Sequence, residues 1–396
     1  MINTIQCVFF FAHRLLNTMI IKVIVVIVSM ILVFGTAQAD SIKKIEKKRN
    51  AAAEGNVIVQ YELGQKYAAG QGVSQSYSEA FKWYRLAADQ GYADAQNNLG
   101  EMFEKGHGVR VNYTEALKWY KLSAGQGNSS AQNNLGSMYE KGRGVTQSNT
   151  EALKWYQSSA AQGHPSGQCN LGMMYEKGQG VTQNFEEAIK WYQLSAEQGN
   201  AAAQNNLGAL YANGQGVGQN LRQALKWYRK SADQGYALGQ CNLGAMYANG
   251  QGVGQSFEQA LKWYNLAVVQ GLAIAQNNLG VMYANGQGVK KDIVEAFKWY
   301  RLAAYQGHAG GECNLGYLYA TGQGVTQNMD EALKWYNMSA LQGYAPAQYN
   351  LGLIYANGQG VIPDKHIAKD WFGKACDNGF QEGCDRFREL KEQGIE

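Results

Sequence analysis

Residues 272–307, LAIAQNNLGVMYANGQGVKKDIVEAFKWYRLAAYQG, contain two helical patterns separated by glycines. In the first half, Ala275 and Leu279 have the four-residue spacing that places apolar side chains on one face of a helix. Trp299 and Ala303 have the same spacing in the second half. We therefore predict that this stretch folds as two amphipathic helices joined by a short turn.

The glycines of this stretch have two readings. Gly-x-Gly can hold a phosphate, but no strand pattern precedes Gly286 and no Gly-Lys-Ser/Thr follows it. Glycine also closes helices in the left-handed conformation, and Asp292 followed by Glu295 is typical of the start of the next helix. We interpret Gly286 and Gly288 as a helix end. Gly280 lies inside the first helix, where glycine costs about 1 kcal/mol relative to alanine, so we expect a neighbouring helix to approach closely there.

This stretch is one copy of a repeat. Tryptophan followed by an aromatic residue recurs nine times, from Trp83 to Trp371, always 36 residues apart. A period of this size is typical of stacked helical units. We predict an all-α fold, an α/α superhelical solenoid of nine tandem 36-residue helix-turn-helix repeats (56–379) with terminal capping helices. The caps are a half-repeat at 40–55 and a C-terminal helix at 380–396, and we expect the tryptophans to lie in the core.

The amino-terminal segment has the pattern of an export signal. The apolar run of residues 23–34 is followed by Ala37-Gln38-Ala39, the small-x-small motif that precedes cleavage. We predict that residues 1–39 are a signal peptide, with Met19 as an alternative start. Twelve apolar residues fall short of the roughly 20 that span a bilayer. An uncleaved segment that anchors the chain to a membrane is the alternative.

Charge and motifs exclude several classes of function. The net charge is +4, about +2 without residues 1–39, and too small for a nucleic-acid-binding face. The histidines beyond residue 39 lack metal-ligand spacing, and no Gly-x-Ser-x-Gly motif occurs. We therefore predict no catalytic residue, no metal and no cofactor.

The repeated motif resembles that of a known family. One unit reads Ala131-Gln-Asn-Asn-Leu135-Gly136…Tyr139…Gly142-Arg-Gly144-Val145, then Ala152…Trp155-Tyr156…Ala160-Ala161-Gln162-Gly163. This pattern resembles the Sel-one-like repeat (SLR) family, relatives of the tetratricopeptide repeats. The resemblance implies an α/α superhelix that acts as an adaptor holding other proteins. It also implies an exported bacterial protein, periplasmic or secreted, with an envelope or host-interaction role.

The cysteines resemble those of a cysteine-rich secreted subgroup of the family. Members of that subgroup join one helix pair to the next by disulfides and are associated with binding or hydrolysing β-lactams. Cys376 and Cys384 match that spacing, which implies a disulfide and, as an alternative function, β-lactam-binding or another envelope-hydrolase activity. Cys169, Cys241 and Cys313 occupy one repeat position two units apart, too far for mutual disulfides. We interpret them as replacements for the asparagine of other units.

One side of the first helix of each unit is a candidate binding surface. On a helical wheel it carries the residues two before, two after and five after the repeat leucine. In related superhelices this side lines the concave surface. It changes from acidic and polar to apolar along the chain, and its candidate partner-binding residues are Asn97, Glu101, Glu104, Asn133, Glu140, Asn277, Val281, Tyr317, Tyr349 and Leu353.

We predict a non-enzymatic exported scaffold that binds a protein or peptide partner through this surface. The alternative is that its alanines and valines reflect helix preference alone, and that its glutamates and lysines form a solvated face. We expect no nucleic-acid partner, membrane contact only if the signal stays uncleaved, and a monomer.

Overall fold

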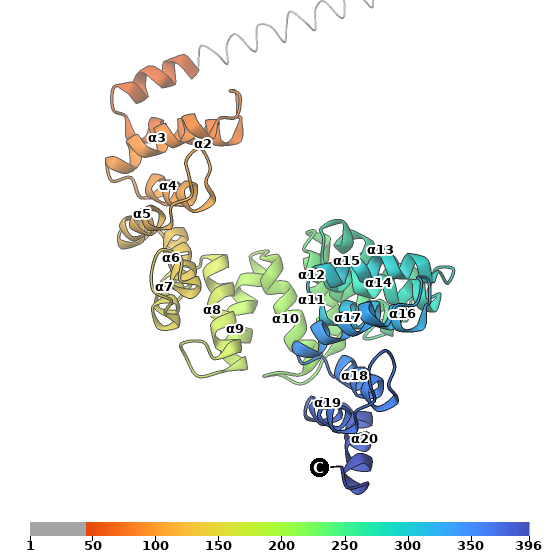
Figure 1. Ribbon diagram of the computed structural model, residues 1–396. Coiled ribbons are helices and arrows are strands. Elements are labelled where there is room, and N and C mark those ends of the chain that lie inside the picture. The colour runs from red at the N-terminus through yellow and green to blue at the C-terminus, as the bar shows by residue number, and fades with distance from the viewer. Residues whose placement is uncertain (1–44, 396) are drawn as a thin grey trace, which may run out of the picture. The chain divides into compact units, whose positions relative to one another are not determined.

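The computed structural model describes residues 45–395, and every regular element in this range is a helix (Figure 1). The predicted signal peptide, residues 1–39, lies outside the described residues. A helical stretch at residues 45–53 precedes α2. None of the helices between residues 45 and 395 has the length and apolarity needed to cross a bilayer.

The helices alternate in short, equal lengths along the chain. They are α2 (Val57–Ala69), α3 (Tyr77–Asp89), α4 (Ala93–Lys105), α5 (Tyr113–Gly125), α6 (Ser129–Lys141), α7 (Asn149–Ala161), α8 (Pro165–Lys177), α9 (Phe185–Glu197), α10 (Ala201–Asn213), α11 (Leu221–Asp233), α12 (Ala237–Asn249), α13 (Phe257–Val269), α14 (Ala273–Asn285), α15 (Ile293–Tyr305), α16 (Ala309–Thr321), α17 (Met329–Leu341), α18 (Ala345–Asn357), α19 (Lys365–Asp377) and α20 (Gln381–Glu392). Each repeat pairs an even-numbered helix, here helix A, with the odd-numbered helix B that follows. The predicted all-α fold of nine tandem helix-turn-helix repeats is confirmed.

The described chain forms two compact bodies. The N-terminal body comprises the described residues up to Leu171 together with Gln179–Val181. The C-terminal body comprises Gly172–Gly178 and the residues from Thr182 onward.

The glycines between helices A and B end one helix and pack the loop. Gly286 has φ +71°, the left-handed conformation, and caps α14. Asp292 accepts a hydrogen bond from the backbone N–H of Glu295 and so starts α15. A Cβ on Gly288 would lie 2.7 Å from the Cβ of Phe257 in the preceding repeat. The interpretation as a helix end is confirmed, and the second glycine also lets each loop approach the preceding helix B.

The glycine inside helix A faces an aromatic ring of helix B. A Cβ on Gly136 would lie 2.7 Å from the Tyr156 ring, which is 1% exposed. Gly280 and Tyr300 have the same relation. The predicted close approach is confirmed, and it lets the two helices of a repeat pack around a buried tyrosine.

The tryptophans belong to the same core. Trp119, Trp227, Trp263 and Trp335 are buried, and the other five are half-buried. This burial agrees with a structural role rather than an open stacking surface for a ligand.

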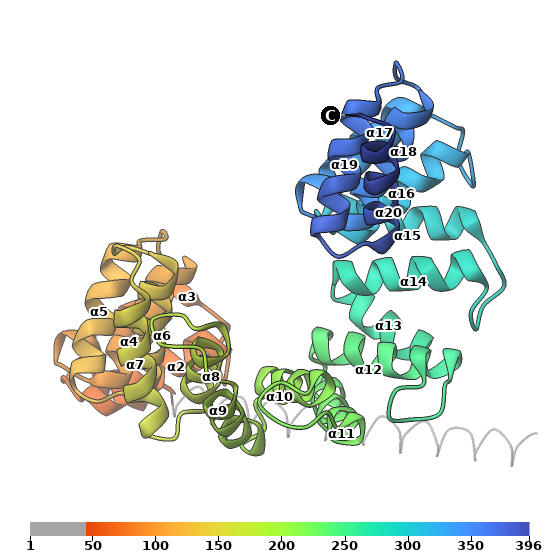
Figure 2. The ribbon, with the colours of Figure 1, turned by 90° about the horizontal axis from the view of Figure 1, so that it is seen from below.

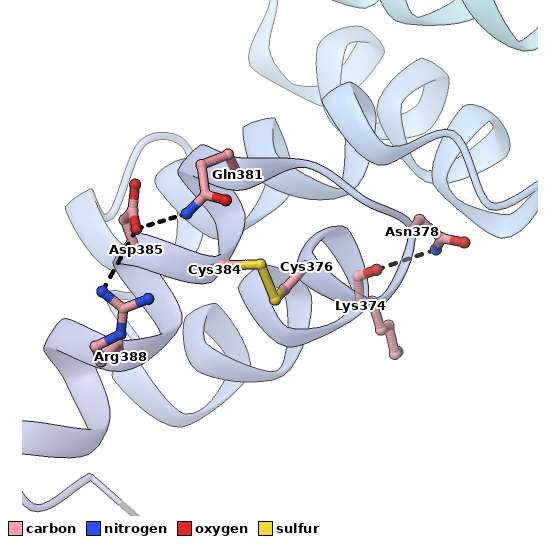
Figure 3. The surroundings of a disulfide bond; sticks show 7 residues. All are labelled: Lys374, Cys376, Asn378, Gln381, Cys384, Asp385 and Arg388. Atoms are coloured by element: carbon pink, nitrogen blue, oxygen red, sulfur yellow. Dashed lines mark hydrogen bonds and ion pairs between the residues drawn. A yellow bond between two sulfur atoms is a disulfide. The ribbon is translucent and has the colours of Figure 1, made fainter.

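A disulfide joins the last two helices. Cys376 near the end of α19 is bonded to Cys384 in the first turn of α20, with 4.5 Å between their Cα atoms (Figure 3). In α20, Gln381 donates to Asp385, which also pairs with Arg388. The disulfide ties a mostly polar terminal helix to the ninth repeat.

Candidate partner-binding face

Buried glutamines connect successive repeats along the helix A side. Gln96 of α4 is 4% exposed and accepts a hydrogen bond from Gln126 Nε2, 2.7 Å away, at the end of α5. Its own amide donates to the carbonyl of Ala88 in the preceding helix B, at 3.2 Å. We call this row the glutamine ladder, and both of its bonds recur at Gln60, Gln132, Gln204, Gln240 and Gln348. Each buried amide is therefore satisfied within the fold.

One ladder position holds a carboxyl group. Glu312 is 1% exposed and accepts from Gln342 Nε2 at 2.8 Å. Burial raises the pKa of the Glu312 carboxyl, although the bond from Gln342 opposes the shift. A carboxylate has no hydrogen to donate to the carbonyl eight residues earlier, whereas a protonated carboxyl does.

Asparagines form a second row, between neighbouring A helices. The predicted site residues Asn97, Asn133 and Asn277 all belong to it. Their Oδ1 atoms accept from Asn134 at 3.1 Å, Asn170 at 2.8 Å and Asn314 at 2.9 Å, respectively. These oxygens are occupied by contacts between repeats. Asn97 also donates to Glu101 at 3.4 Å, and Glu101 pairs with Lys105.

Cysteine replaces asparagine at some positions of this row, and the contact between neighbouring A helices is kept. Cys241 and Cys313 accept from Asn278 and Asn350, each at 3.8 Å between nitrogen and sulfur. Burial raises the pKa of both thiols to about 12. Together with the burial of Cys169, this agrees with cysteine as a replacement for asparagine at this position.

The acidic part of the predicted surface lies in the N-terminal body. Glu104 accepts from the Tyr120 hydroxyl at 2.9 Å and pairs with Arg143 at 3.0 Å. Glu140 accepts from Tyr156 at 2.7 Å, one repeat later. Burial raises the pKa of Tyr120 strongly, and the nearby Glu104 carboxylate adds to the shift. Each of these glutamates covers the tyrosine of its own repeat and accepts a hydrogen bond from its hydroxyl.

The apolar part, in the C-terminal body, contains a pocket of about 400 Å³ between α16, α17 and α18. The predicted residues Tyr317 and Leu353 both line it, and Tyr317 is 47% exposed. The remaining lining residues are Ala320, Thr321, Gln327, Met329, Tyr336, Asn350, Ile354 and Gln359. None of the lining side chains is an acid, a lysine, an arginine or a histidine.

A small residue lines the pocket at a repeat position that is acidic at Glu104 and Glu140. Ala320 holds the repeat position of Glu104, and Tyr336 holds that of Tyr120. Glu104 covers Tyr120 in the N-terminal body, whereas Ala320 and Tyr336 both line the pocket. The lining is therefore apolar with an uncharged polar margin, which favours an apolar side chain of a partner.

Two other predicted residues lie outside the pocket. The ring centroid of Tyr349 lies 5.5 Å from that of Phe372 and 5.2 Å from that of Phe380, so Tyr349 closes the carboxyl end of the core. Val281 is half-buried against the core around α15. The helical wheel placed both on the same stripe as Tyr317, and the structure packs both, partly buried, against the core.

Nine successive segments of the chain match one known repeat family. The Sel1 repeat family matches at residues 57–92, 93–128, 129–164, 165–200, 201–236, 237–271, 273–308, 309–344 and 345–380. A search of curated proteins gives no significant match.

Two solved structures share both sequence and fold with this chain. One is a protective antigen present in uropathogenic Escherichia coli strains, which displays an SLR fold. It is 35% identical over 88% of this chain and 83% of its own, with a TM-score of 0.59. The other is a Sel1 repeat protein from Oxalobacter formigenes, 34% identical over 62% of this chain and 96% of its own, with a TM-score of 0.56.

Proposed function

The chain belongs to the Sel1 repeat family, and from this premise we propose that it is a non-enzymatic scaffold that binds a protein or peptide. Sel1 repeat proteins have a scaffold fold that commonly mediates protein–protein interaction. The binding site that we propose is the pocket between α16, α17 and α18. It takes an apolar side chain of the partner.

The uncharged pocket carries this proposal. Tyr317 exposes nearly half of its side chain at the pocket, and Leu353 lies on the next helix A. A volume of about 400 Å³ is at the small end of the range for ligand sites and suits one or two side chains. An apolar residue enters without desolvating a charge, whereas a charged residue would lose its hydration with no counter-ion in the lining.

The repeat itself supplies a substitution that closes the pocket. In Ala320→Glu the new side chain has the same relation to Tyr336 that Glu104 has to Tyr120, so we expect it to form the same bond and keep the fold. Ala284→Glu makes the same change one repeat earlier, outside the pocket lining, and is the matched control. The double variant Tyr317→Glu with Leu353→Glu charges both sides of the pocket.

The test begins with a photo-crosslinking amino acid placed at Thr321 in the producing cell, followed by identification of the crosslinked partner. Affinity of the purified partner is then measured for each variant, with circular dichroism as the check on folding. We expect Ala320→Glu and the double variant to lose binding and Ala284→Glu to keep it. Equal affinity for all of the folded variants would refute the pocket assignment.

We further propose that the protein is exported from a bacterial cell. The apolar run at residues 23–34 and Ala37-Gln38-Ala39 support this proposal, and the Cys376–Cys384 disulfide suits an oxidising compartment. Mass spectrometry of the amino terminus of the native protein tests it, with Asp40 as the expected first residue. A native chain that retains residues 23–34 would instead be anchored.

The disulfide is also the feature shared with the β-lactam-associated subgroup. Hydrolysis of a chromogenic cephalosporin by the purified chain therefore tests the enzymatic alternative directly. We expect no turnover above that of a heat-denatured sample. Turnover that disappears with the fold would replace the scaffold proposal by an enzymatic one.

A further inference from the structure

One ring in the partner-binding pocket has a hydroxyl without a hydrogen bond. The Tyr336 side chain is 3% exposed and lines the pocket. Its helix, α17, packs against both α16 and α18 (Figure 2). Within residues 45–395, the part of the chain that the structure describes, no group accepts a hydrogen bond from this hydroxyl. A buried tyrosine hydroxyl usually has a partner, so this donor is available to a ligand.

A tyrosine at the same repeat position in the N-terminal body does have an acceptor. The Tyr120 hydroxyl donates to Glu104 at 2.9 Å. The Tyr120 ring packs on Gly100 and the Tyr336 ring packs on Gly316, because a Cβ on these glycines would lie 2.7 and 3.0 Å from the respective rings. The two tyrosines therefore lie on helix A in the same way, and both hydroxyls face the repeat position of Glu104.

In the repeat of Tyr336 this position holds no acceptor. Ala320 lies six whole repeats after Glu104, and it lines the pocket. Its methyl group cannot accept a hydrogen bond. Burial raises the pKa of the Tyr336 hydroxyl, so at neutral pH the hydroxyl keeps the proton that it can donate. The pocket therefore contains a buried donor, and only water or a bound partner can supply its acceptor.

The pocket favours a neutral acceptor over a carboxylate. Glu104 also pairs with Arg143 at 3.0 Å, whereas the residue six repeats after Arg143 is Gln359, which lines the pocket and has a neutral amide. Glu140 has Gln179 at the matching position, but Glu140 is half-buried and keeps contact with water. A docked partner excludes that water, and a carboxylate in the pocket would then lose its hydration without a counter-ion.

We propose that the pocket binds a glutamine of the partner and that the Tyr336 hydroxyl selects it by donating to the amide carbonyl. The glutamine side chain has the length of the glutamate that covers Tyr120, without its charge. Its two methylene groups contact the apolar lining, and the amide of Gln359 at the margin can donate a second bond. This inference rests on the proposed function and refines it, because the apolar contact comes from the stem of the inserted residue.

The hydroxyl gives a first test that needs no ligand. Tyr336→Phe removes an oxygen that has no bond within the chain, so we expect its thermal midpoint to equal or exceed that of the native chain. Tyr120→Phe is the matched control, because it removes the bond to Glu104 and should lower the midpoint. A midpoint lowered equally by both changes would show that the Tyr336 hydroxyl is bonded within the fold, and would overturn the proposal.

Random twelve-residue peptides displayed on phage are the probe for specificity. Selection on the native full chain, after depletion on Ala320→Glu, enriches peptides that bind the pocket. We expect one position of the enriched peptides to be glutamine. Enrichment of leucine or methionine alone would overturn the need for an acceptor, and enrichment of glutamate or aspartate would overturn its neutrality.

The affinity of the tightest enriched peptide is then measured for matched variants. Tyr336→Phe should weaken binding at least about fivefold, since the buried amide carbonyl loses its donor. Tyr300→Phe makes the same change one repeat earlier, outside the pocket lining, and should bind as the native chain does. A peptide with leucine in place of the glutamine should bind more weakly and should not distinguish Tyr336→Phe from the native chain.

This inference and the pocket assignment fail in different ways. Peptides that bind Ala320→Glu as tightly as the native chain would show that the pocket is not the binding site, and both proposals would fall. Peptides that require the open pocket but bind Tyr336→Phe as tightly as the native chain would leave the pocket assignment intact. In that case only the selective role of the Tyr336 hydroxyl would be refuted.

Discussion

Replacing Gly136 by alanine tests whether the glycine inside helix A is required by the tyrosine of helix B. The new Cβ would lie 2.7 Å from two atoms of the Tyr156 ring, whereas carbon atoms pack best at about 3.5–4.0 Å. The ring cannot easily move away, because it is 1% exposed and its hydroxyl bonds to Glu140 at 2.7 Å. We therefore expect the two helices to be forced apart.

The expected change combines two opposing terms. Overpacking of a core costs about 1–3 kcal/mol, and the fixed ring places this site in the upper half of that range. Alanine in place of glycine inside a helix contributes about 1 kcal/mol in the other direction. The free energy of unfolding should therefore fall by about 1–2 kcal/mol.

The matched control is Gly125→Ala, in α5 of the same body. A Cβ at Gly125 meets no atom within 4 Å, so only the helix-propensity term remains. We expect this variant to be stabilised by up to about 1 kcal/mol. The two variants make the same chemical change and should shift the stability in opposite directions.

Equilibrium urea denaturation followed by circular dichroism measures both variants, and comparison of midpoints avoids assuming two-state unfolding in a repeat protein. Adding Tyr156→Leu to Gly136→Ala should cost less than the sum of the single changes, because the ring that clashes is gone. A Gly136→Ala midpoint at or above that of the native chain would refute the argument.

Three further outcomes concern Glu312, the disulfide and two of the free cysteines. Because the unfolded Glu312, with a pKa near 4.5, loses its proton before the folded one, stability should fall as the pH rises from 4.5 through the raised pKa of the folded carboxyl. Glu312→Gln should remove this pH dependence and should be more stable than the native chain at neutral pH, as measured by thermal melts. Identical pH profiles of stability for the variant and the native chain would contradict this expectation. Reduction of the Cys376–Cys384 disulfide should lower stability by about 2–3 kcal/mol and speed hydrogen exchange in α20 first, whereas exchange unchanged in α20 would argue against this role. Cys241 and Cys313, with pKa values of about 12, should react with a thiol reagent at pH 8 only after denaturation, and rapid labelling of the folded chain would exclude their burial.

The fold could be predicted in detail because each local signal occurs many times. Gly286 and Asp292 mark a helix end and a helix start by chemistry that acts within a few residues. The interior glycine, of which Gly136 is one example, indicated a close approach because it is unfavourable in a helix without one. Sequence did not show that a tyrosine was the approaching group, since that contact depends on how two helices cross.

The candidate site was predictable only in part. A helical wheel identified Tyr317 and Leu353, because their exposure depends on the position along one helix. It could not identify Tyr336 or Gln327, since these come from helix B and from a loop of the same pocket. It also could not show that Asn133 bonds to the next repeat, because that bond joins residues 37 positions apart.

The glutamine ladder constrains how a gene for this protein can change in length. Gln96 has its donor 30 residues later and its acceptor eight residues earlier, and the ladder repeats both intervals. Duplication or loss of a whole 36-residue unit leaves every such interval intact. Within a helix of the array, an insertion or deletion that moves the glutamine away from either partner would leave a buried amide unpaired, at about 1–3 kcal/mol each. Complete units can therefore be added or removed without breaking the ladder, and each added unit brings one more helix A.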